Sequence, residues 1–251
     1  MKVKQIIALV IVVALLMTGS VLVTMAYLTD THTVTNVFTV GNIQMKLDEA
    51  VVDMEGNPTE RDGKTRTEEG NDYHLMPGHR YVKDPTVTIY ANSEECYVRL
   101  MVKVSNYAAL NAAFPSEKYP EFYQTIGGQT FFALEGLVEG YDAATWNCVD
   151  LEVAADGSAT YEFRYKTAVA KSPTDTPLES LFDEVVIPGN ISNEALQLIN
   201  NLTIDVTAHA IQTDGFNNNV ADAWDAFDRE YAANADATTT TTEGQTEVGS
   251  Q

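Results

Sequence analysis

The stretch "YVRLMVKV", residues 97–104, decides the fold class, because two kinds of side chain alternate along it. One face is wholly apolar and the other is mixed: Val98, Leu100, Val102 and Val104 stand against Tyr97, Arg99, Met101 and Lys103. Successive side chains of a strand point to opposite faces, so this period of two predicts a half-buried strand of an antiparallel sheet.

The same alternation recurs along the chain. It predicts further strands at 34–40, 43–47, 86–90, 161–166 and 202–210, with weaker signals at 130–134 and 149–153. About eight strands with little helix predict an all-β protein, and this number favours a two-sheet antiparallel sandwich of the jelly-roll kind over any α/β fold.

Helices are expected only as short accessory elements. A threonine-proline pair at 176–177, with a glutamate three residues after the threonine, is typical of a helix N-terminus. Helix also fits 194–200 and 220–231, and the second of these segments has Trp224 and Phe227 three residues apart.

The first 26 residues have the features of an export signal. Lysines at positions 2 and 4 precede an apolar run at 6–17 and a polar break, and small residues stand at Thr24 and Ala26. This order predicts a signal peptide that is cleaved between Ala26 and Tyr27. The alternative is an uncleaved membrane anchor, since 6–23 is just long enough to span a bilayer.

The chain is strongly acidic, with a formal net charge of -21. Because the only charged residues among the first 26 are lysines, the exported chain is more acidic still. Such a charge argues against nucleic acid and anionic membrane surfaces as partners, so membrane contact is expected only before cleavage.

The exported part is expected to form one β-sandwich domain over 27–233. Within it, 49–71 is charged, contains glycine and is poor in aromatic residues, which predicts a mobile, solvated acidic loop. From 234 to 251 the chain is rich in threonine and alanine, which predicts a disordered tail.

Two cysteines are too few for a disulfide framework. In an oxidising compartment Cys96 and Cys148 would form one bridge. Cys96 shares the parity of the expected core residues Val98 and Leu100, however, which equally fits a buried free thiol.

No motif for catalysis or cofactor binding stands out. The chain has no HExxH zinc motif and no GxSxG elbow, and His74 and His79 flank a turn, where solvated histidines are expected. The oxygens at 214–219 lack the spacing of an EF-hand, so a polar turn is expected there. The sequence therefore predicts no enzyme activity, no cofactor and no metal site.

Three stretches carry a family resemblance: "AYLTDTHTVTNVFTVGNIQMKLDE" at 26–49, "HLMPGHRYVKDPTVTIYANSEECYVRLMVKV" at 74–104 and "LTIDVTAHAIQTDGF" at 202–216. They resemble the TasA and camelysin family of exported matrix proteins of Gram-positive bacteria. The resemblance implies a jelly-roll core, a dedicated signal peptidase, and a place in the extracellular matrix or on the cell surface, where some members form fibres. Camelysin was classed as a metallopeptidase, but this chain has no recognisable zinc motif.

The start of the exported chain is the expected assembly strand. It is nearly uncharged and has high β-propensity, and its expected contact residues are Thr31, Thr33, Val34, Thr35, Val37 and Phe38. Once freed by cleavage, such a strand can add to a sheet edge of another subunit and build an open, head-to-tail homopolymer. The alternative is that 27–40 pairs within its own domain.

The sequence thus predicts an extracellular structural protein, a subunit of biofilm-matrix or cell-surface fibres. Its expected partners are copies of itself, the signal peptidase and other matrix proteins. Two alternatives stay open, a camelysin-like surface metallopeptidase and an adhesin or carbohydrate-binding β-sandwich. The adhesin reading is favoured if exposed aromatic residues such as Trp146, Trp224 and Tyr97 form a flat platform.

Overall fold

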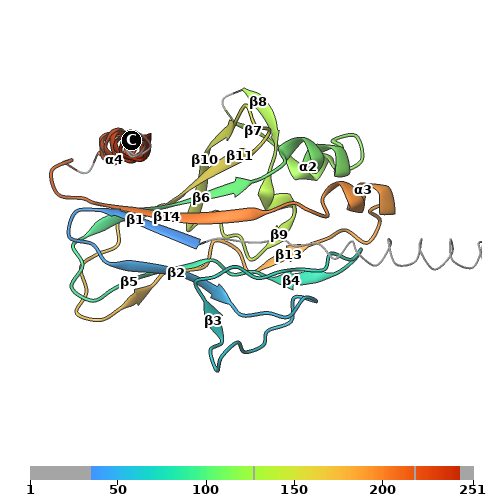
Figure 1. Ribbon diagram of the computed structural model, residues 1–251, viewed down its shortest axis with the longest axis horizontal. Coiled ribbons are helices and arrows are strands. Elements are labelled where there is room, and N and C mark those ends of the chain that lie inside the picture. Colours follow the sequence, from blue (N-terminus) through green and yellow to red (C-terminus); the bar gives the residue numbers. More distant parts are fainter. Residues whose placement is uncertain (1–34, 127, 218, 244–251) are drawn as a thin grey trace, which may run out of the picture.

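A computed structural model describes residues 35–126, 128–217 and 219–243 of the chain (Figure 1). The signal peptide, its cleavage site at Ala26 and Tyr27, and the assembly residues Thr31, Thr33 and Val34 lie outside the described residues. Within the described ranges, no helix combines the length and the apolar character that a membrane span requires.

The larger sheet has five strands in the order β1-β14-β6-β11-β10. Their bounds are Thr35–Val40 for β1, Cys96–Val104 for β6, Trp146–Val153 for β10, Ala159–Tyr165 for β11 and Ile204–Gln212 for β14. β1 runs parallel to β14, whereas the other neighbours are antiparallel. The sheet therefore has one parallel edge, at β1, and one antiparallel edge, at β10.

A second sheet has four strands in the order β12-β5-β2-β3. Its strands are β2 Met45–Ala50, β3 Arg66–Thr67, β5 Thr86–Ile89 and β12 Thr176–Pro177. Smaller sheets join β4 Arg80–Val82, β13 Glu184–Val186 and β9 Val138–Glu139, and pair β7 Tyr123–Ile126 with β8 Gln129–Phe132. The helices are α2 Tyr107–Ala113, α3 Asn193–Leu198 and α4 Val220–Glu243, with short 3-10 helices η1 Pro120–Phe122 and η2 Leu134–Gly136.

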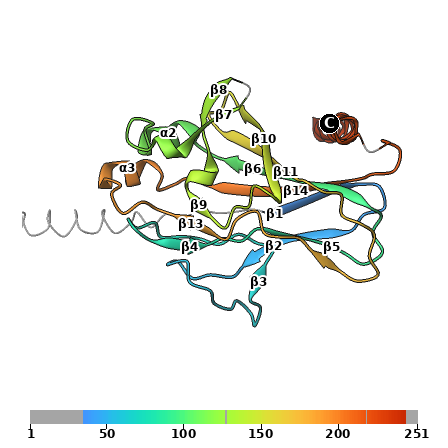
Figure 2. The same cartoon turned by 180° about the vertical axis from the view of Figure 1, so that it is seen from behind.

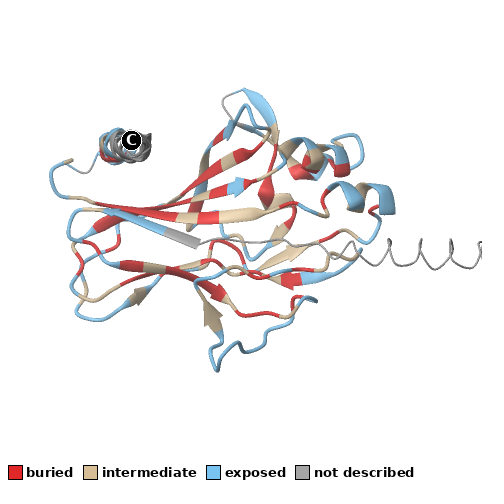
Figure 3. Ribbon diagram, in the orientation of Figure 1, coloured by how far each residue is buried: buried red, intermediate tan, exposed pale blue. Residues whose placement is uncertain are grey.

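The core lies between the two main sheets. Two opposite views place the five-stranded sheet on one side of it and the four-stranded sheet on the other (Figures 1 and 2). Leu100 and Val206 from the first and Leu47 and Val87 from the second belong to one buried apolar cluster. Buried residues run along β14, β6 and β2 accordingly (Figure 3). Each such aliphatic side chain stabilises the fold by about 1.5–3 kcal/mol.

The predicted strands are all present and the chain is all-β, as the alternating pattern indicated. Most strands that the pattern missed, β3, β4, β9, β12 and β13, are only two or three residues long, and β7 has four. A period of two cannot be recognised over so few residues. Helices are confirmed at α3 and α4.

The helix predicted at 176–177 is wrong. Thr176 and Pro177 form β12 instead, pairing with Ile89 and Thr88 of β5. The backbone N–H of Leu178 continues this contact by donating to the carbonyl oxygen of Val87 at 2.8 Å. The capping signal is local, and pairing with the neighbouring sheet overrides it because Leu178 becomes buried in the extended form.

The tail expected to be disordered over 234–251 begins as helix, because α4 continues to Glu243. The alanines that follow Tyr231 have high helix propensity, and extending an existing helix costs less than starting one. The remaining residues, 244–251, lie outside the described part of the chain.

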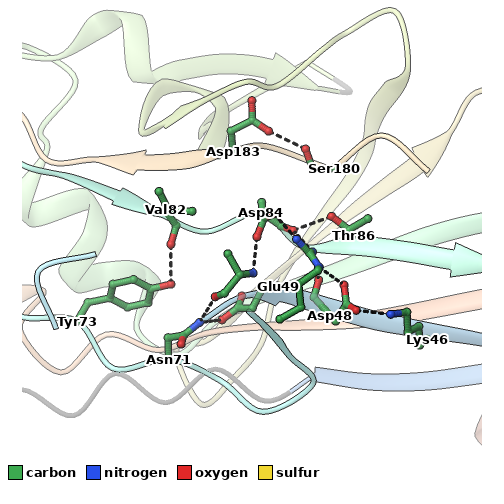
Figure 4. A network of polar contacts seen from close by, with 12 residues as sticks. Lys46, Asp48, Glu49, Asn71, Tyr73, Val82, Asp84, Thr86, Ser180 and Asp183 are labelled. Carbon is green, nitrogen blue, oxygen red and sulfur yellow. Dashed lines mark hydrogen bonds and ion pairs between the residues drawn. The ribbon is translucent and has the colours of Figure 1, made fainter. Parts of the chain in front are cut away.

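The segment 49–71, predicted as a mobile solvated loop, is held at both ends (Figure 4). The Arg66 guanidinium donates to Asp48 Oδ1 and to Asp84 Oδ2, each at 2.6 Å. Glu49 is fully buried and Asn71 is 1% exposed. The middle of the segment, 57–65, is exposed as expected, whereas its ends are buried through polar partners that composition alone does not reveal.

The predicted disulfide between Cys96 and Cys148 is not formed, since both thiols are free. Cys148 of β10 aligns through Phe163 of β11 with Leu100 of β6, and Cys96 lies further along that strand. Two strand spacings of about 4.8 Å already exceed the Cα separation of about 7 Å that a disulfide spans. The alternative of a buried free thiol therefore describes Cys96.

Candidate assembly site

β1 is an edge strand of the five-stranded sheet. It pairs with β14 in an unbroken parallel register from Thr35 opposite Val206 to Val40 opposite Ile211. Within the described ranges no strand pairs with its other side. Its outward backbone groups therefore remain available to another strand.

The side chains of β1 are unusual for an exposed edge. Val37 is 36% exposed and Phe38 is 41% exposed, and no charged residue occurs between Thr35 and Val40. Edge strands that avoid association usually carry charges, prolines or bulges. β1 has none of these features, although the chain as a whole is strongly acidic.

Phe38 lies between the sheet and helix α4. Its ring meets the ring of His209 edge-on at 5.8 Å between centroids, and that of Tyr231 edge-on at 5.2 Å. His209 is the β14 residue opposite Phe38 in the register, and Tyr231 belongs to α4. In both views α4 lies on the face of the sheet that points away from the core (Figures 1 and 2).

Arg99 of β6 is the centre of what we term the α4 cluster, which comprises Arg99, His209, Trp224, Phe227, Asp228 and Tyr231. The side chain of Arg99 is 3% exposed, and its guanidinium carbon lies 4.5 Å from the ring centroid of Trp224 and 5.0 Å from that of Phe227. It forms an ion pair with Asp228 and a longer one, at 3.4 Å, with Glu162. These contacts fasten α4 to the sheet.

His209 joins Arg99 to the aromatic part of the cluster. Its Nδ1 accepts a hydrogen bond from Arg99 Nε at 3.1 Å, and its ring stacks on Phe227 at 4.7 Å. Burial, helped by the positive charge of Arg99 and opposed by Asp228, lowers the pKa of His209 to about 4. The imidazole is therefore neutral at pH 7, and Nε2 has no hydrogen-bond partner among the described residues.

Three of the predicted assembly residues, Thr35, Val37 and Phe38, lie together in β1. The pairing of 35–40 within its own chain corresponds to the alternative that the sequence left open. The sequence did not predict that the α4 cluster would contact this strand. The spacing of Trp224 and Phe227 was its only signal in the sequence, because Arg99 and His209 lie on faces that alternation marks as polar.

The three aromatic residues suggested for an adhesin platform are not on the surface. Trp146 is 0% exposed, Trp224 is 1% exposed and Tyr97 is 7% exposed. Trp224 and Tyr97 pack in one small apolar cluster beneath α4, whereas Trp146 belongs to the main core. None of the three rings is accessible for stacking on a sugar.

The part of the chain that the structure describes contains no group of three or more histidine, cysteine, aspartate or glutamate residues placed to hold a metal ion. A comparison of the chain with protein-family models, with curated proteins and with solved structures found no match.

Proposed function

We propose that this chain is an extracellular structural protein, a subunit of biofilm-matrix or cell-surface fibres that assemble through the N-terminal strand. The observation that carries the proposal is β1 itself, an uncharged edge strand with half-exposed apolar side chains in a very acidic protein. Such a strand can approach another subunit with little electrostatic repulsion and can exchange main-chain hydrogen bonds with it.

The finer fold and the family are part of this proposal. The two main sheets form a sandwich of the jelly-roll kind, and the chain is a member of the TasA and camelysin family, exported through a cleaved signal peptide. The shared core between the sheets supports the sandwich. The family rests on the three stretches of sequence at 26–49, 74–104 and 202–216.

The pairing of β1 with β14 suggests how subunits would join. A β1 strand that leaves its own sheet exposes the edge of β14, and the β1 strand of a neighbour can make the same contacts there. Phe38 of the incoming strand would then lie against His209 and Tyr231 of the acceptor, as it does within one chain. Because donor and acceptor are different surfaces, the contact repeats without closing and yields a filament.

Deletion of 27–40 from the exported chain, which removes β1 together with the residues before it, tests this function. We expect the full exported chain to form filaments visible by electron microscopy, and the deletion variant to stay soluble, folded by circular dichroism and free of filaments. Deletion of 244–251 is the matched control and should leave assembly unchanged. Filaments from the 27–40 deletion, or none from the full exported chain, would refute strand donation. An unfolded deletion variant would show that this segment belongs to its own domain's sheet.

A further inference from the structure

A buried group of three polar side chains lies away from the assembly strand. Glu49 is on β2, Asn71 follows β3 and Lys83 follows β4, and their exposures are 0%, 1% and 2%. Lys83 Nζ donates to Glu49 Oε2 at 2.7 Å, and Asn71 Nδ2 donates to Glu49 Oε1 at 2.7 Å. One carboxylate thus holds an amine and a primary amide side by side (Figure 4 shows Glu49 and Asn71).

The amide of Asn71 is fixed by further contacts. Its Oδ1 accepts hydrogen bonds from the backbone N–H of Val52 at 3.2 Å and from the Arg61 guanidinium at 3.3 Å. Its Nδ2 also donates to the carbonyl oxygen of Ala50 at 2.9 Å. Donors on Oδ1, one of them cationic, draw electrons from the amide carbon and stabilise negative charge that develops on that oxygen during attack.

The surroundings of Lys83 are largely apolar. Lys83 borders an apolar cavity of about 60 Å³, together with Tyr73, Tyr81, Leu134 and Ile187. The hydrogen bond between Lys83 Nζ and Glu49 Oε2 is a direct path along which the carboxylate can accept the proton that the ammonium must lose before it attacks. The transfer leaves a neutral amine, which is the nucleophilic form of lysine.

We propose that Lys83 and Asn71 form an intramolecular isopeptide bond, with Glu49 as the general acid and base. Lys83 Nζ attacks Asn71 Cγ, whose oxygen carries the negative charge of the tetrahedral intermediate. Glu49 takes one proton from the ammonium of Lys83 to give the attacking amine, delivers that proton to Nδ2, and then takes the second proton from the attacking nitrogen. The bond between Cγ and Nδ2 breaks, ammonia leaves, and the Nζ–Cγ bond remains, so an amine and a primary amide become a secondary amide and ammonia with no oxidant or cofactor.

The arrangement meets the requirements of this reaction better than those of a simple ion pair. A buried ion pair of Lys83 and Glu49 also needs a donor on the second carboxylate oxygen, but it does not need donors on the amide oxygen of Asn71. Here two donors hold that amide oxygen, and the second carboxylate oxygen holds the leaving nitrogen. Holding the reacting groups in one orientation replaces most of the entropy that an intermolecular reaction would lose. The product would covalently join the segment after β3 to the segment after β4, independently of any assembly through β1.

Mass spectrometry of the denatured, purified full chain tests the proposal. We expect a mass about 17 Da below that of the sequence, equal to the ammonia lost in aminolysis of the amide. A tryptic digest should contain a branched peptide that joins Asn71 to Lys83, with no cleavage after Lys83. A succinimide at Asn71 would lose the same mass but leave Lys83 open to trypsin, so the digest separates the two.

Two variants locate the chemistry. Glu49→Gln keeps the size of the acid but cannot exchange the protons, and Lys83→Met removes the nucleophile, so both should show the full mass. Lys46→Met is the control and should retain the mass loss. Lys46 is partly exposed and pairs with Asp48, outside the group of three buried side chains. A folded wild-type chain with the full mass and normal cleavage after Lys83 overturns the proposal, whether or not the variants fold. Persistence of the branched peptide in Glu49→Gln overturns the role of Glu49.

Discussion

The two edges of the five-stranded sheet differ in how they meet solvent. At one edge, β10 shifts register between Cys148 and Asp150, and it exposes the carboxylates of Asp150 and Glu152. At the other, β1 keeps its register with β14 throughout and carries no charge. Bulges and charges are the usual devices by which proteins prevent strands from adding to an edge.

The comparison indicates that one edge is protected and the other is left open. Exposed apolar side chains do not distinguish them, because Val153 at the end of β10 is 49% exposed and Phe38 is 41% exposed. Charge, backbone regularity and the aromatic residues of α4 do distinguish them. These differences support the proposal that subunits meet at β1, and the predictions below contrast the two edges.

The largest effect is expected at Arg99, whose buried guanidinium fastens α4 beside β1. Arg99→Ala should lower the free energy of unfolding by about 3 kcal/mol. It removes a buried cation that pairs with Asp228 and lies over two aromatic rings of α4. Arg164→Ala, near β10, should change it by less than about 1 kcal/mol, since that side chain is 29% exposed. Urea unfolding measures both, and equal losses would contradict the assigned role of Arg99.

A pH effect of similar size is expected at His209. Its pKa falls from 6.5 to about 4 on folding, so the neutral form stabilises the folded state. That contribution is complete above pH 6.5 and is lost as the pH falls towards 4, by up to about 3 kcal/mol.

The measurement is the free energy of unfolding at pH 7 and pH 4.5 for the wild type and for His209→Gln, which keeps an acceptor for Arg99. Carboxylates also titrate in this range, so the difference between the two proteins is the readout. The variant should lose less stability on acidification, and parallel losses would show that His209 does not contribute.

A smaller effect is expected for the exposed apolar residues themselves. Phe38→Ala should cost about 1.5 kcal/mol, because it removes edge-on contacts with His209 and Tyr231. Val153→Ala at the other edge should change stability by less than about 0.5 kcal/mol. Thermal or urea unfolding of the two variants tests whether β1 is better anchored than the end of β10.

The smallest effect concerns the thiols and leaves stability unchanged. Labelling of denatured, unreduced protein should find both Cys96 and Cys148 free. In the folded protein at pH 7, Cys148 should react slowly, since burial raises its pKa to about 12. Cys96→Ser isolates this reaction, and rapid labelling of Cys148 would show that the β10 edge is more open than described.

The long strands could be predicted from the sequence because each buries one face, and a buried face imposes a period of two. The two-residue strands could not be predicted, since pairing with a neighbour defines them. At Thr176 the local helix signal was overridden for the same reason, because this segment pairs with the edge of β5.

The strand β1 and its lack of charge were predictable, because absence of charge is a property of consecutive residues. The α4 cluster and the Glu49, Asn71 and Lys83 group were not, since each joins residues from separate segments. Composition marked Glu49 and Asn71 as solvated, and only the fold gives them buried partners. Sequence patterns thus report which side of a strand is buried, but not which polar residues meet inside.

The most direct test of β1 as the subunit contact is electron microscopy of the exported chain with one charge placed at either edge. Phe38→Asp and Val153→Asp make the same kind of change at side chains of similar exposure on opposite edges of one sheet. With both variants folded by circular dichroism, the account predicts filaments from Val153→Asp and none from Phe38→Asp. Filaments from Phe38→Asp, or their loss in both variants, would contradict it.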